Sequence, residues 1–439
     1  IVPESVAGPQ FSFNFTKRTY RTGGKNMNDS LSMVAKHVST VRSEDKIFAL
    51  NREAGNAVLQ FGKEKVVNAT VGSILDEDEK LAVLPSVLET LRNLPDSEFA
   101  AYAPILGTPD YLESAIQAAF KEYRPEGYIK AAATPGGSGA LRQTIWNYSE
   151  IGDTILTSDW YWGPYKTLAE ENLRKLSVFS LFDNEKRFNL DSFEMKVKEL
   201  LTRQNSLVIL LNSPAQNPTG YALSDEEWEQ VIMIIKREAL DKSKKITLIC
   251  DIAYIDYAGK ASDTRRFMRL FSGLPSNVLV VVAFSISKSL TMYGLRTGAA
   301  VCVSSDKGVV EEFSGVFEAS NRGTWSNGTR CGMKLLSVIM NDKELLRKVD
   351  EEREQVRLLL EKRAEVFTNE AKSVKLDICP YNAGFFVTIP AAQSEESCKL
   401  LKKDNIFAVP MSRGIRFAIC SVPLYKMKGI AEKIKKAVE

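Results

Sequence analysis

The sequence predicts an α/β protein: a three-layer α/β/α domain with a mainly parallel sheet, accompanied by a smaller α+β domain. Residues 207–211 and 278–284 are uninterrupted apolar runs, which are typical of strands buried on both faces of a parallel sheet. Strand and helix patterns alternate from about residue 100 to 305, as in helix-covered parallel sheets. Polar residues follow the ends of these strands, where such sheets bind ligands.

Length and composition narrow the class of protein. The 439 residues are 44% hydrophobic and 26% charged, which is typical of globular proteins with two domains. A net charge of +3, from 58 basic and 55 acidic residues, argues against a nucleic-acid surface, and no window is apolar enough for a membrane span. Six scattered cysteines and a single histidine, His37, argue against a metal site. We therefore expect a soluble cytoplasmic protein with no nucleic-acid, membrane or metal partner, and the start shows no signal-peptide pattern.

The pattern of charge and periodicity also predicts the domain organisation. We expect an irregular N-terminal arm, the first part of a small domain, a large domain, and a long linking helix with the rest of the small domain, over residues 1–33, 34–80, 81–330 and 331–439. Helical patterns are expected over 31–42 and from Leu81 to Leu91, and a long charged helical stretch over about 330–370. The arm is long enough to pack on a second subunit.

Lys288 is the first candidate for chemistry. It follows the apolar run over 278–284, so we expect it at the carboxyl end of a buried strand. Lysine forms Schiff bases with aldehyde cofactors, of which pyridoxal phosphate is the commonest. Ser285 and Arg296 nearby are groups that the phosphate of this cofactor requires. The alternative is a surface lysine at a strand end.

Other strand ends carry what the cofactor ring requires. Asp251 is placed to keep the ring nitrogen protonated, although it could instead cap a helix. Asn217 and Tyr254 could donate to the phenolic oxygen, and Trp162 could provide a flat wall for the ring or simply pack in the core. Each of these residues has a structural explanation alone, but their order on alternating strands and helices favours a pyridoxal-phosphate site.

A glycine-rich turn is the candidate phosphate site. Residues 135–141 contain three glycines and Ser138 ahead of a predicted helix, and a helix N-terminus with free amides binds anions. Glycine turns before helices are common, so this motif is weak alone. With Ser285 and Arg296, we expect Gly137 and Ser138 to hold the phosphate.

These motifs resemble those of class I, fold-type I pyridoxal-phosphate-dependent aminotransferases, the aspartate and aromatic aminotransferase family. The resemblance runs from about Val66 to the C-terminus. Its most specific parts are the stretches 217–220, 251–254 and 285–288, followed by Arg296. It implies that Ser138 binds the phosphate and that Trp162 stacks on the ring.

The resemblance also implies a homodimer with shared active sites. Tyr102 is similar to a tyrosine that reaches the phosphate of the neighbouring subunit, and Arg322 to an arginine that crosses the dimer to the distal carboxylate of a dicarboxylic substrate. Arg416 matches the arginine that grips the α-carboxylate. Gly72 and Phe386 resemble positions of the pocket wall, and Asn217 and Trp162 also border the substrate.

The implied reaction is a ping-pong transamination. Lys288 anchors the cofactor and moves the substrate proton, Asp251 stabilises the charge that develops, and Tyr254 assists. The donor would be L-aspartate or an aromatic amino acid and the acceptor 2-oxoglutarate. The family's aspartate-specific members carry other polar residues or histidines where this chain has Pro164, Tyr165 and Asn212, so the choice between the two donors stays open.

Two other functions remain open. Another enzyme of the same scaffold, such as a carbon–sulfur lyase, an amino-acid decarboxylase or a synthase, would use the same cofactor residues. A cofactor-binding transcription regulator would need a DNA-binding module ahead of the sheet. The first 60 residues contain no helix-turn-helix pattern or dense basic stripe, which argues against that class.

Overall fold

A computed structural model describes residues 33–35, 37–38 and 45–439 of the chain. The chain divides into two units, Ile1–Arg42 and Ser43–Glu439. In the first unit the described side chains, His37 among them, are exposed. Of the helix expected over 31–42 the structure describes only residues 33–35 and 37–38, and none of these is helical; nearly all of the expected arm lies outside the described residues. The following paragraphs concern the second unit.

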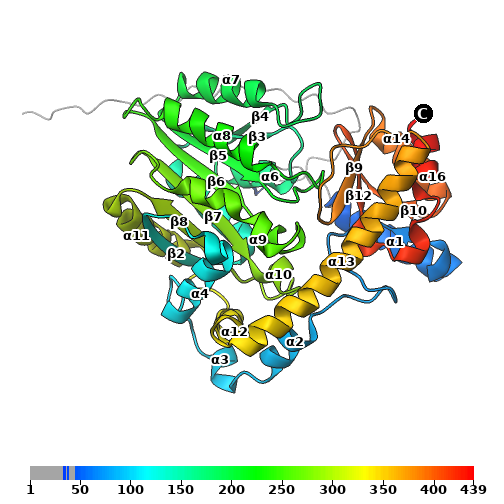
Figure 1. Ribbon diagram of the computed structural model, residues 1–439, viewed down its shortest axis with the longest axis horizontal. Helices are drawn as coiled ribbons and strands as arrows, with labels where there is room; N and C mark the ends of the chain where they lie inside the picture. Colours follow the sequence, from blue (N-terminus) through cyan, green and yellow to red (C-terminus); the bar gives the residue numbers. More distant parts are fainter. Residues whose placement is uncertain (1–32, 36, 39–44) are drawn as a thin grey trace, which may run out of the picture. The chain divides into compact units, whose positions relative to one another are not determined.

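A seven-stranded sheet forms the larger region, with the strand order β2-β8-β7-β6-β5-β3-β4 (Figure 1). Its strands are β2 (Tyr128–Thr134), β3 (Thr154–Ser158), β4 (Lys175–Phe179), β5 (Ser206–Asn212), β6 (Lys245–Asp251), β7 (Val278–Ser285) and β8 (Gly298–Ser304). The strands from β7 to β4 run parallel, and β8 is antiparallel to both of its neighbours. The predicted mainly parallel sheet is confirmed.

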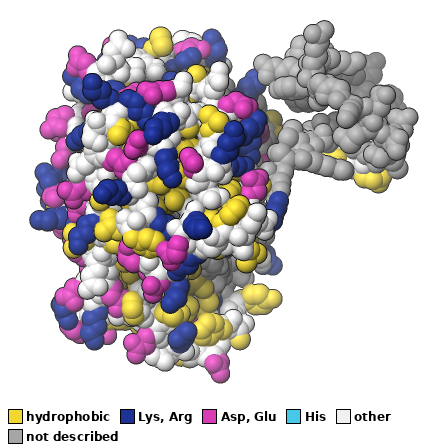
Figure 2. Space-filling view, turned by 90° about the vertical axis from the view of Figure 1, so that its right-hand side faces the viewer, with side chains coloured by type: hydrophobic (Ala, Val, Ile, Leu, Met, Phe, Trp, Pro, Cys, Tyr) yellow, Lys and Arg dark blue, Asp and Glu magenta, His cyan; other side chains and the backbone are white. Residues whose placement is uncertain are grey.

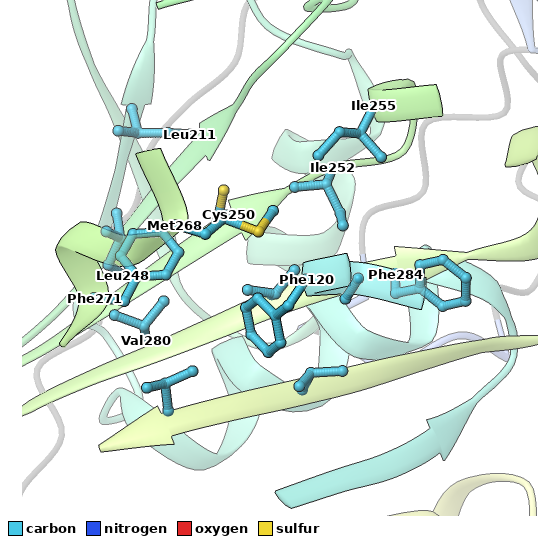
Figure 3. Packing of buried hydrophobic residues seen from close by; sticks show 14 of the residues in the cluster. Phe120, Leu211, Leu248, Cys250, Ile252, Ile255, Met268, Phe271, Val280 and Phe284 are labelled. Carbon is cyan, nitrogen blue, oxygen red and sulfur yellow. The ribbon is translucent and has the colours of Figure 1, made fainter. Parts of the chain in front are cut away.

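Helices cover both faces of this sheet. One face packs against α5 (Gly136–Tyr148), α6 (Pro164–Glu171) and α11 (Lys307–Thr324). The other packs against α4 (Pro109–Phe120), α7 (Leu190–Leu201), α8 (Asp225–Glu238) and α12 (Arg330–Asn341). Successive residues of a strand point to opposite faces, so Val281 of β7 joins one core and Val280 the other. Figure 3 shows this second core, where Phe120 of α4 lies beside β7.

A smaller α+β region combines segments from both ends of the second unit. Its antiparallel sheet has the order β11-β12-β9, and a two-stranded parallel pair joins β1 to β10. The strands are β1 (Val67–Asn68), β9 (Phe386–Pro390), β10 (Ile406–Phe407), β11 (Val409–Met411) and β12 (Gly414–Ala418). The helices are α1 (Lys46–Phe61), α14 (Ser394–Lys403), α15 (Leu424–Met427) and α16 (Ile430–Val438). Most of these elements surround a separate apolar core around Phe417 and Ile434, whereas α1 packs on Val66 and Phe407.

The long helix α13 (Lys343–Ser373) contacts both regions. It packs on α12 and α2 (Pro85–Arg92) at one end and on α15 and α16 at the other (Figure 1). The sequence indicated a single helical stretch over about 330–370, but the structure interrupts it at Asp342. The Asp342 carboxylate accepts hydrogen bonds from the amides of Glu344 and Leu345 and thereby starts α13 as a new helix.

Two other segments differ from the sequence patterns. The leucine pattern predicted a helix from Leu81, but α2 begins at Pro85, because proline at the first helical position has no amide to donate. The apolar run from residue 66 pairs as a strand only over Val67–Asn68. The remaining short helices are α3 (Asp96–Ala100), α9 (Ala261–Thr264) and α10 (Ile286–Ser289). Among the described helices, none has the length and apolarity that crossing a membrane requires.

Candidate active site

Three neighbouring parallel strands end in polar side chains at one edge of the large sheet. β5 ends at Asn212, β6 at Asp251 and β7 at Ser285. Asn212 is paired with Asp251 in the sheet register, and Asp251 with Ala283. The carboxyl ends of the three strands therefore meet, which is the arrangement that the sequence pattern predicted for a ligand site.

Lys288 lies just beyond β7, in the short helix α10. The Ser285 hydroxyl starts this helix by accepting a hydrogen bond from the Ser287 amide at 3.2 Å. The Ser289 hydroxyl donates to the Ser285 carbonyl at 3.1 Å. These bonds fix the backbone on both sides of Lys288, so its side chain leaves the sheet edge in a defined direction.

The surroundings of Lys288 favour a neutral amine. Its Nζ lies 5.2 Å from the ring centroid of Tyr293 and 6.0 Å from that of Tyr254. Burial, together with the charge of Arg296, lowers the pKa of Lys288 from 10.5 to about 8, against the opposing charge of Asp251. An appreciable share of the side chain is then unprotonated near neutral pH, which an amine nucleophile requires.

Asp251 is buried and hydrogen-bonded on both carboxylate oxygens. The Tyr165 hydroxyl donates to Oδ2 at 2.6 Å, and the Ala253 amide donates to Oδ1 at 3.1 Å. Burial raises the pKa of Asp251, whereas these hydrogen bonds and the charge of Lys288 oppose the rise. The site therefore contains a desolvated carboxylate with a fixed orientation.

Sequence reasoning missed the residues that hold Asp251. Tyr165 and Asn212 stood out only as departures from the family pattern. In the structure the Asn212 side-chain amide donates to the Asp251 backbone carbonyl at 2.8 Å, and its side-chain oxygen accepts from the backbone amide of Asn217 at 2.8 Å. The one available indication was that a polar side chain follows Trp162 shortly afterwards and that another ends a buried strand.

A chain of polar contacts links the large region to Arg416 in β12. The Asn217 side-chain amide donates to the Tyr254 hydroxyl at 3.3 Å, and the Arg416 guanidinium donates to the Asn217 side-chain oxygen at 3.4 Å. Arg416 also donates to the Thr70 carbonyl at 2.7 Å. The structure thus brings together three residues that the sequence proposed from distant motifs.

One donor of the Arg416 guanidinium has no hydrogen-bond partner among the described residues. The side chain is buried, and its Nε has no hydrogen-bond partner within the part of the chain that the structure describes. Its guanidinium carbon lies 4.4 Å from the ring centroid of Phe386, and a Cβ added to Gly72 would lie 2.6 Å from Phe386 Cζ. A buried donor without a partner, backed by a close apolar wall, suits an incoming carboxylate.

The glycine-rich turn at the start of α5 lies against Arg296. Gly136 has a φ of +65°, and a Cβ added there would lie 2.5 Å from Arg296 Nη2. A Cβ added to Gly137 would lie 3.6 Å from Ser285 Cβ, and Ser138 occupies the same first helical turn. Free helix amides, hydroxyls and a guanidinium therefore share one location, as an anion site requires.

A pocket of about 320 Å³ opens beside this site. Its lining includes Trp162, Asn217 and Arg416, together with Met411 of the small region and Ile47 of α1. Trp162 is partly buried and packs edge-on against Tyr165 with ring centroids 5.6 Å apart. The pocket is therefore bordered by Asn217 and Arg416, two members of the chain of polar contacts described above.

Within the described part of one chain, the hydrogen bonds of Tyr102 and Arg322 go to Arg330 and Ser326, and not to the residues of the candidate site. The Tyr102 side chain is 87% exposed, and its carbonyl accepts a hydrogen bond from Arg330 at 3.1 Å. Arg322 lies in the last turn of α11, where it is exposed and donates to the Ser326 hydroxyl at 2.8 Å. That Tyr102 and Arg322 contact the phosphate and the substrate in a neighbouring subunit stays a prediction.

Comparison with known proteins finds aminotransferases by family model, by sequence and by structure. The family model for aminotransferase class I and II matches residues 64–434. The aspartate aminotransferase of Escherichia coli strain K12 is 24% identical over 358 residues, which are 79% of this chain and 87% of that protein. The aromatic-amino-acid aminotransferase of the same strain is 26% identical over 338 residues, 73% and 81% of the two chains. A solved aminotransferase structure from Anaerococcus prevotii has a TM-score of 0.91 and 42% identity, covering 93% of this chain and all of that one.

Proposed function

The chain belongs to the class I and II aminotransferase family, and we propose that it is a pyridoxal-phosphate enzyme that transfers the amino group of L-aspartate or an aromatic amino acid to 2-oxoglutarate by a ping-pong mechanism. One observation carries the proposal. Lys288, whose pKa is lowered to about 8, lies at the same edge of the sheet as the buried carboxylate of Asp251. A nucleophilic amine beside a desolvated carboxylate is the pair that pyridoxal chemistry uses.

The donor set at this edge fits the chemical groups of pyridoxal phosphate. The amides at the start of α5 and the guanidinium of Arg296 suit its phosphate. Asp251 would pair with a protonated ring nitrogen, and Asn217 and Tyr254 would donate to the phenolic oxygen. When bound through Lys288, the cofactor supplies an electron sink for the substrate's α-carbon.

Lys288 is the proposed proton carrier. Once the substrate amine has replaced it, its own amine can accept the proton from the substrate's α-carbon. A pKa of about 8 suits this exchange, because the group both gains and loses a proton readily near neutral pH. The hydrogen bonds at Ser285 and Ser289 keep the lysine backbone in place during the transfer.

Arg416 is the proposed binding group for the α-carboxylate. Its unpartnered Nε and its neighbour Asn217 provide donors, and Phe386 and Gly72 close the wall behind it. The partly buried ring of Trp162 would stack against the cofactor and border the substrate side chain in the adjoining pocket. This wall of apolar and aromatic groups accommodates an aromatic substrate as well as a small dicarboxylate.

A second copy of the chain completes the proposed site. Arg322 would contact the distal carboxylate of aspartate or 2-oxoglutarate from the neighbouring subunit, and Tyr102 would reach that subunit's phosphate. Support comes from the exposure of both side chains within one chain, which leaves them free to serve another. The proposed state is therefore a homodimer.

The remaining proposals concern partners and location. Amino acids and 2-oxo acids are the proposed small-molecule partners, with neither nucleic acid nor membrane. On the face shown in Figure 2, basic and acidic side chains are interspersed, unlike the basic patch of a nucleic-acid surface. A cytoplasmic location is supported by the six free cysteines, because a reducing compartment keeps thiols unpaired.

The test is an absorption spectrum of the purified holoenzyme during addition of amino acid without any 2-oxo acid. We expect a visible band in the wild type that L-aspartate or L-tyrosine abolishes. Restoration of the band by 2-oxoglutarate would establish the second half-reaction. The variant Lys288→Ala should lack both the band and turnover.

The outcomes separate the alternatives. A response to aspartate favours a functional Arg322 in the dimer, whereas a response to tyrosine alone places the enzyme on the aromatic side. A colourless wild type reconstituted with pyridoxal phosphate contradicts the proposal. A coloured protein that both amino acids leave unchanged would instead favour the carbon–sulfur lyase or decarboxylase alternative.

A further inference from the structure

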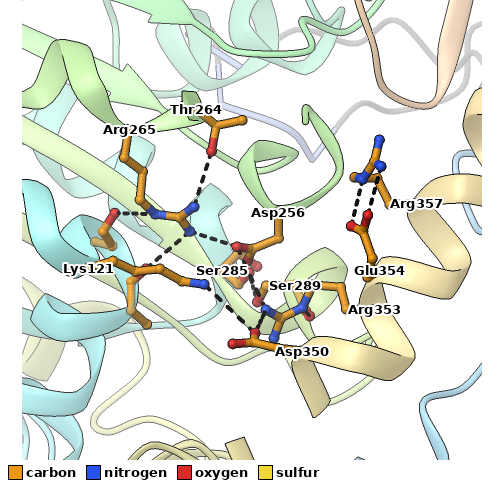
Figure 4. Close-up of polar contacts among 12 residues, drawn as sticks. Lys121, Asp256, Thr264, Arg265, Ser285, Ser289, Asp350, Arg353, Glu354 and Arg357 are labelled. Atoms are coloured by element: carbon orange, nitrogen blue, oxygen red, sulfur yellow. Dashed lines mark hydrogen bonds and ion pairs between the residues drawn. The ribbon is translucent and has the colours of Figure 1, made fainter. Parts of the chain in front are cut away.

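A cluster of charges, buried at Asp256, Arg265 and Arg353 and partly exposed at Asp350 and Lys121, lies outside the residues assigned above. Figure 4 shows its members: Lys121, Asp256, Arg265, Asp350 and Arg353. Arg265 donates to Asp256 at 2.7 Å, Arg353 donates to Asp350 at 2.7 Å, and Lys121 lies 3.8 Å from Asp350. The three cations exceed the two carboxylates by one charge, so the guanidinium groups must find further acceptors.

Backbone carbonyls supply those acceptors. Arg265 donates to the carbonyls of Ala118 and Ala119, near the C-terminal end of α4, where helix carbonyls lack partners. Arg353 Nε donates to the carbonyl of Ser289 at 2.8 Å. Ser289 directly follows Lys288, so a guanidinium from the long helix α13 binds the backbone of the proposed catalytic segment.

The same guanidinium also acts on the segment of Tyr254. Asp256 lies two residues beyond Tyr254, and its Oδ1 is 3.9 Å from Arg353 Nη1. Burial alone would raise the pKa of Asp256, yet the charges of Arg265, Arg353 and Lys121 hold it well below its usual value. Asp256 therefore stays ionised, and its segment remains attached to the cluster.

We infer that Arg353 is a positioning residue of the active site, which fixes the segment of Lys288 through the Ser289 carbonyl and the segment of Tyr254 through Asp256. It has no direct part in the chemistry, since its donors face the side of these segments that carries the cluster. The inference rests on the proposed function, because it concerns how the reactive lysine is held. Its physical basis is that a small displacement of a reacting group slows a reaction far more than it weakens binding.

Three variants and one control test this. Arg353→Met keeps the length of the side chain and removes every donor, and Arg353→Lys restores the charge with a different geometry. Arg363→Met removes another buried arginine of α13, which bonds to Glu77 and the Cys420 carbonyl instead. Arg347→Met removes an exposed arginine of the same helix, ion-paired to Glu344, and serves as the matched surface control.

The thermal stability of each variant is measured on its apoprotein. After reconstitution with pyridoxal phosphate, we measure the pH midpoint of the visible cofactor band, and kcat and KM for the amino donor. For Arg353→Met we expect kcat to fall about 10- to 100-fold with little change in KM, as for a misplaced catalytic group. The pH midpoint should also move. Arg353→Lys should recover part of both effects, and Arg347→Met should behave as the wild type.

Arg363→Met provides the measure of general damage. If it loses as much thermal stability as Arg353→Met but keeps the pH midpoint and kcat, the effects at Arg353 are specific to positioning. If Arg353→Met loses stability alone, with kcat and midpoint unchanged, the inference is wrong. Should Arg353→Met fail to fold, the comparison of Arg353→Lys with the wild type decides by the same two readouts. A wild type without colour or transamination contradicts the proposed function instead.

Discussion

The hydroxyl of Tyr165 donates a hydrogen bond to Asp251 Oδ2 over 2.6 Å, and both side chains are buried. Burial, reinforced by the negative charge of Asp251, raises the pKa of Tyr165 well above 10. The hydroxyl therefore keeps its proton at every pH at which such an enzyme works. In this chain the orientation of the buried carboxylate depends on a partner that does not titrate near neutral pH.

Removing that hydroxyl should weaken the carboxylate as an acid. In Tyr165→Phe the pKa of Asp251, already raised by burial, should rise further because the hydrogen bond that opposes the rise is lost. We expect a kcat about 10-fold lower, a destabilisation of about 1–2 kcal/mol, and an acid limb of the pH–kcat profile displaced to higher pH. Tyr148→Phe is the matched control, since the Tyr148 hydroxyl has no partner in the described residues. Unchanged profiles in both variants would contradict this role.

The lowered pKa of Lys288 predicts how the stability of the apoprotein depends on pH. The lysine binds its proton less readily when folded, with a pKa of about 8 against 10.5 in the unfolded chain. The destabilisation is complete below pH 8 and disappears as the pH rises through 10.5. Lys288→Met should therefore be more stable than the wild type below pH 8, by about 3 to 4 kcal/mol, and lose this advantage in alkali. Urea denaturation of both apoproteins at several pH values measures it; a constant difference would refute the lowered pKa.

Arg322 should affect dicarboxylic substrates selectively. Arg322→Ala removes the proposed distal cation, and loss of one charge-assisted pair with a carboxylate should raise KM for aspartate and 2-oxoglutarate about 10- to 100-fold. For tyrosine the donor half-reaction should be nearly unchanged. Half-reaction kinetics with each amino acid separate the two effects. Equal losses for both donors would mean that Arg322 does not bind the distal carboxylate.

Gly136 should tolerate no side chain. Gly136→Ala would force a residue with a φ of +65° and bring a Cβ to 2.5 Å from Arg296 Nη2. We expect a destabilisation of about 1–3 kcal/mol from the backbone strain, and a cofactor half-saturation concentration raised about 10-fold or more through displacement of the guanidinium. Gly315→Ala in α11, where a Cβ meets open space, is the control. Fluorescence titration of the apoproteins with pyridoxal phosphate provides the measurement.

The sequence correctly predicted which residues share a sheet edge, because the direction of parallel strands alone determines this. Apolar runs buried on both faces predict parallel strands, and parallel strands bring their ends together, so Asp251 and Lys288 could be assigned to one edge without coordinates. The antiparallel direction of β8 was not predicted, because an apolar run has the same pattern in either direction. Likewise the start of α2 depends on Pro85 rather than on the leucine periodicity.

The contacts that orient the site escaped prediction because they join residues far apart in sequence. Tyr165 and Asp251 are separated by 86 positions, and Arg353 and Ser289 by 64. Neither pair belongs to a local motif. The first forms when α6 packs against the sheet, and the second when α13 reaches the segment that follows β7. Local patterns therefore indicate which residues carry chemistry, whereas the packing determines which residues support them.

The pairing of β1 with β10 has a consequence for the order of folding during synthesis. The large sheet is complete at residue 304, but β1 must wait for β10, which ends at Phe407. Domains that are complete first can fold first while the ribosome is still at work. A nascent chain would therefore form the sheet edge near Lys288 well before β12, the strand that contains Arg416, can pair. A chain stalled on the ribosome near residue 400 would contain the residues proposed to bind the cofactor but would lack Arg416, the residue proposed to bind the α-carboxylate of the substrate.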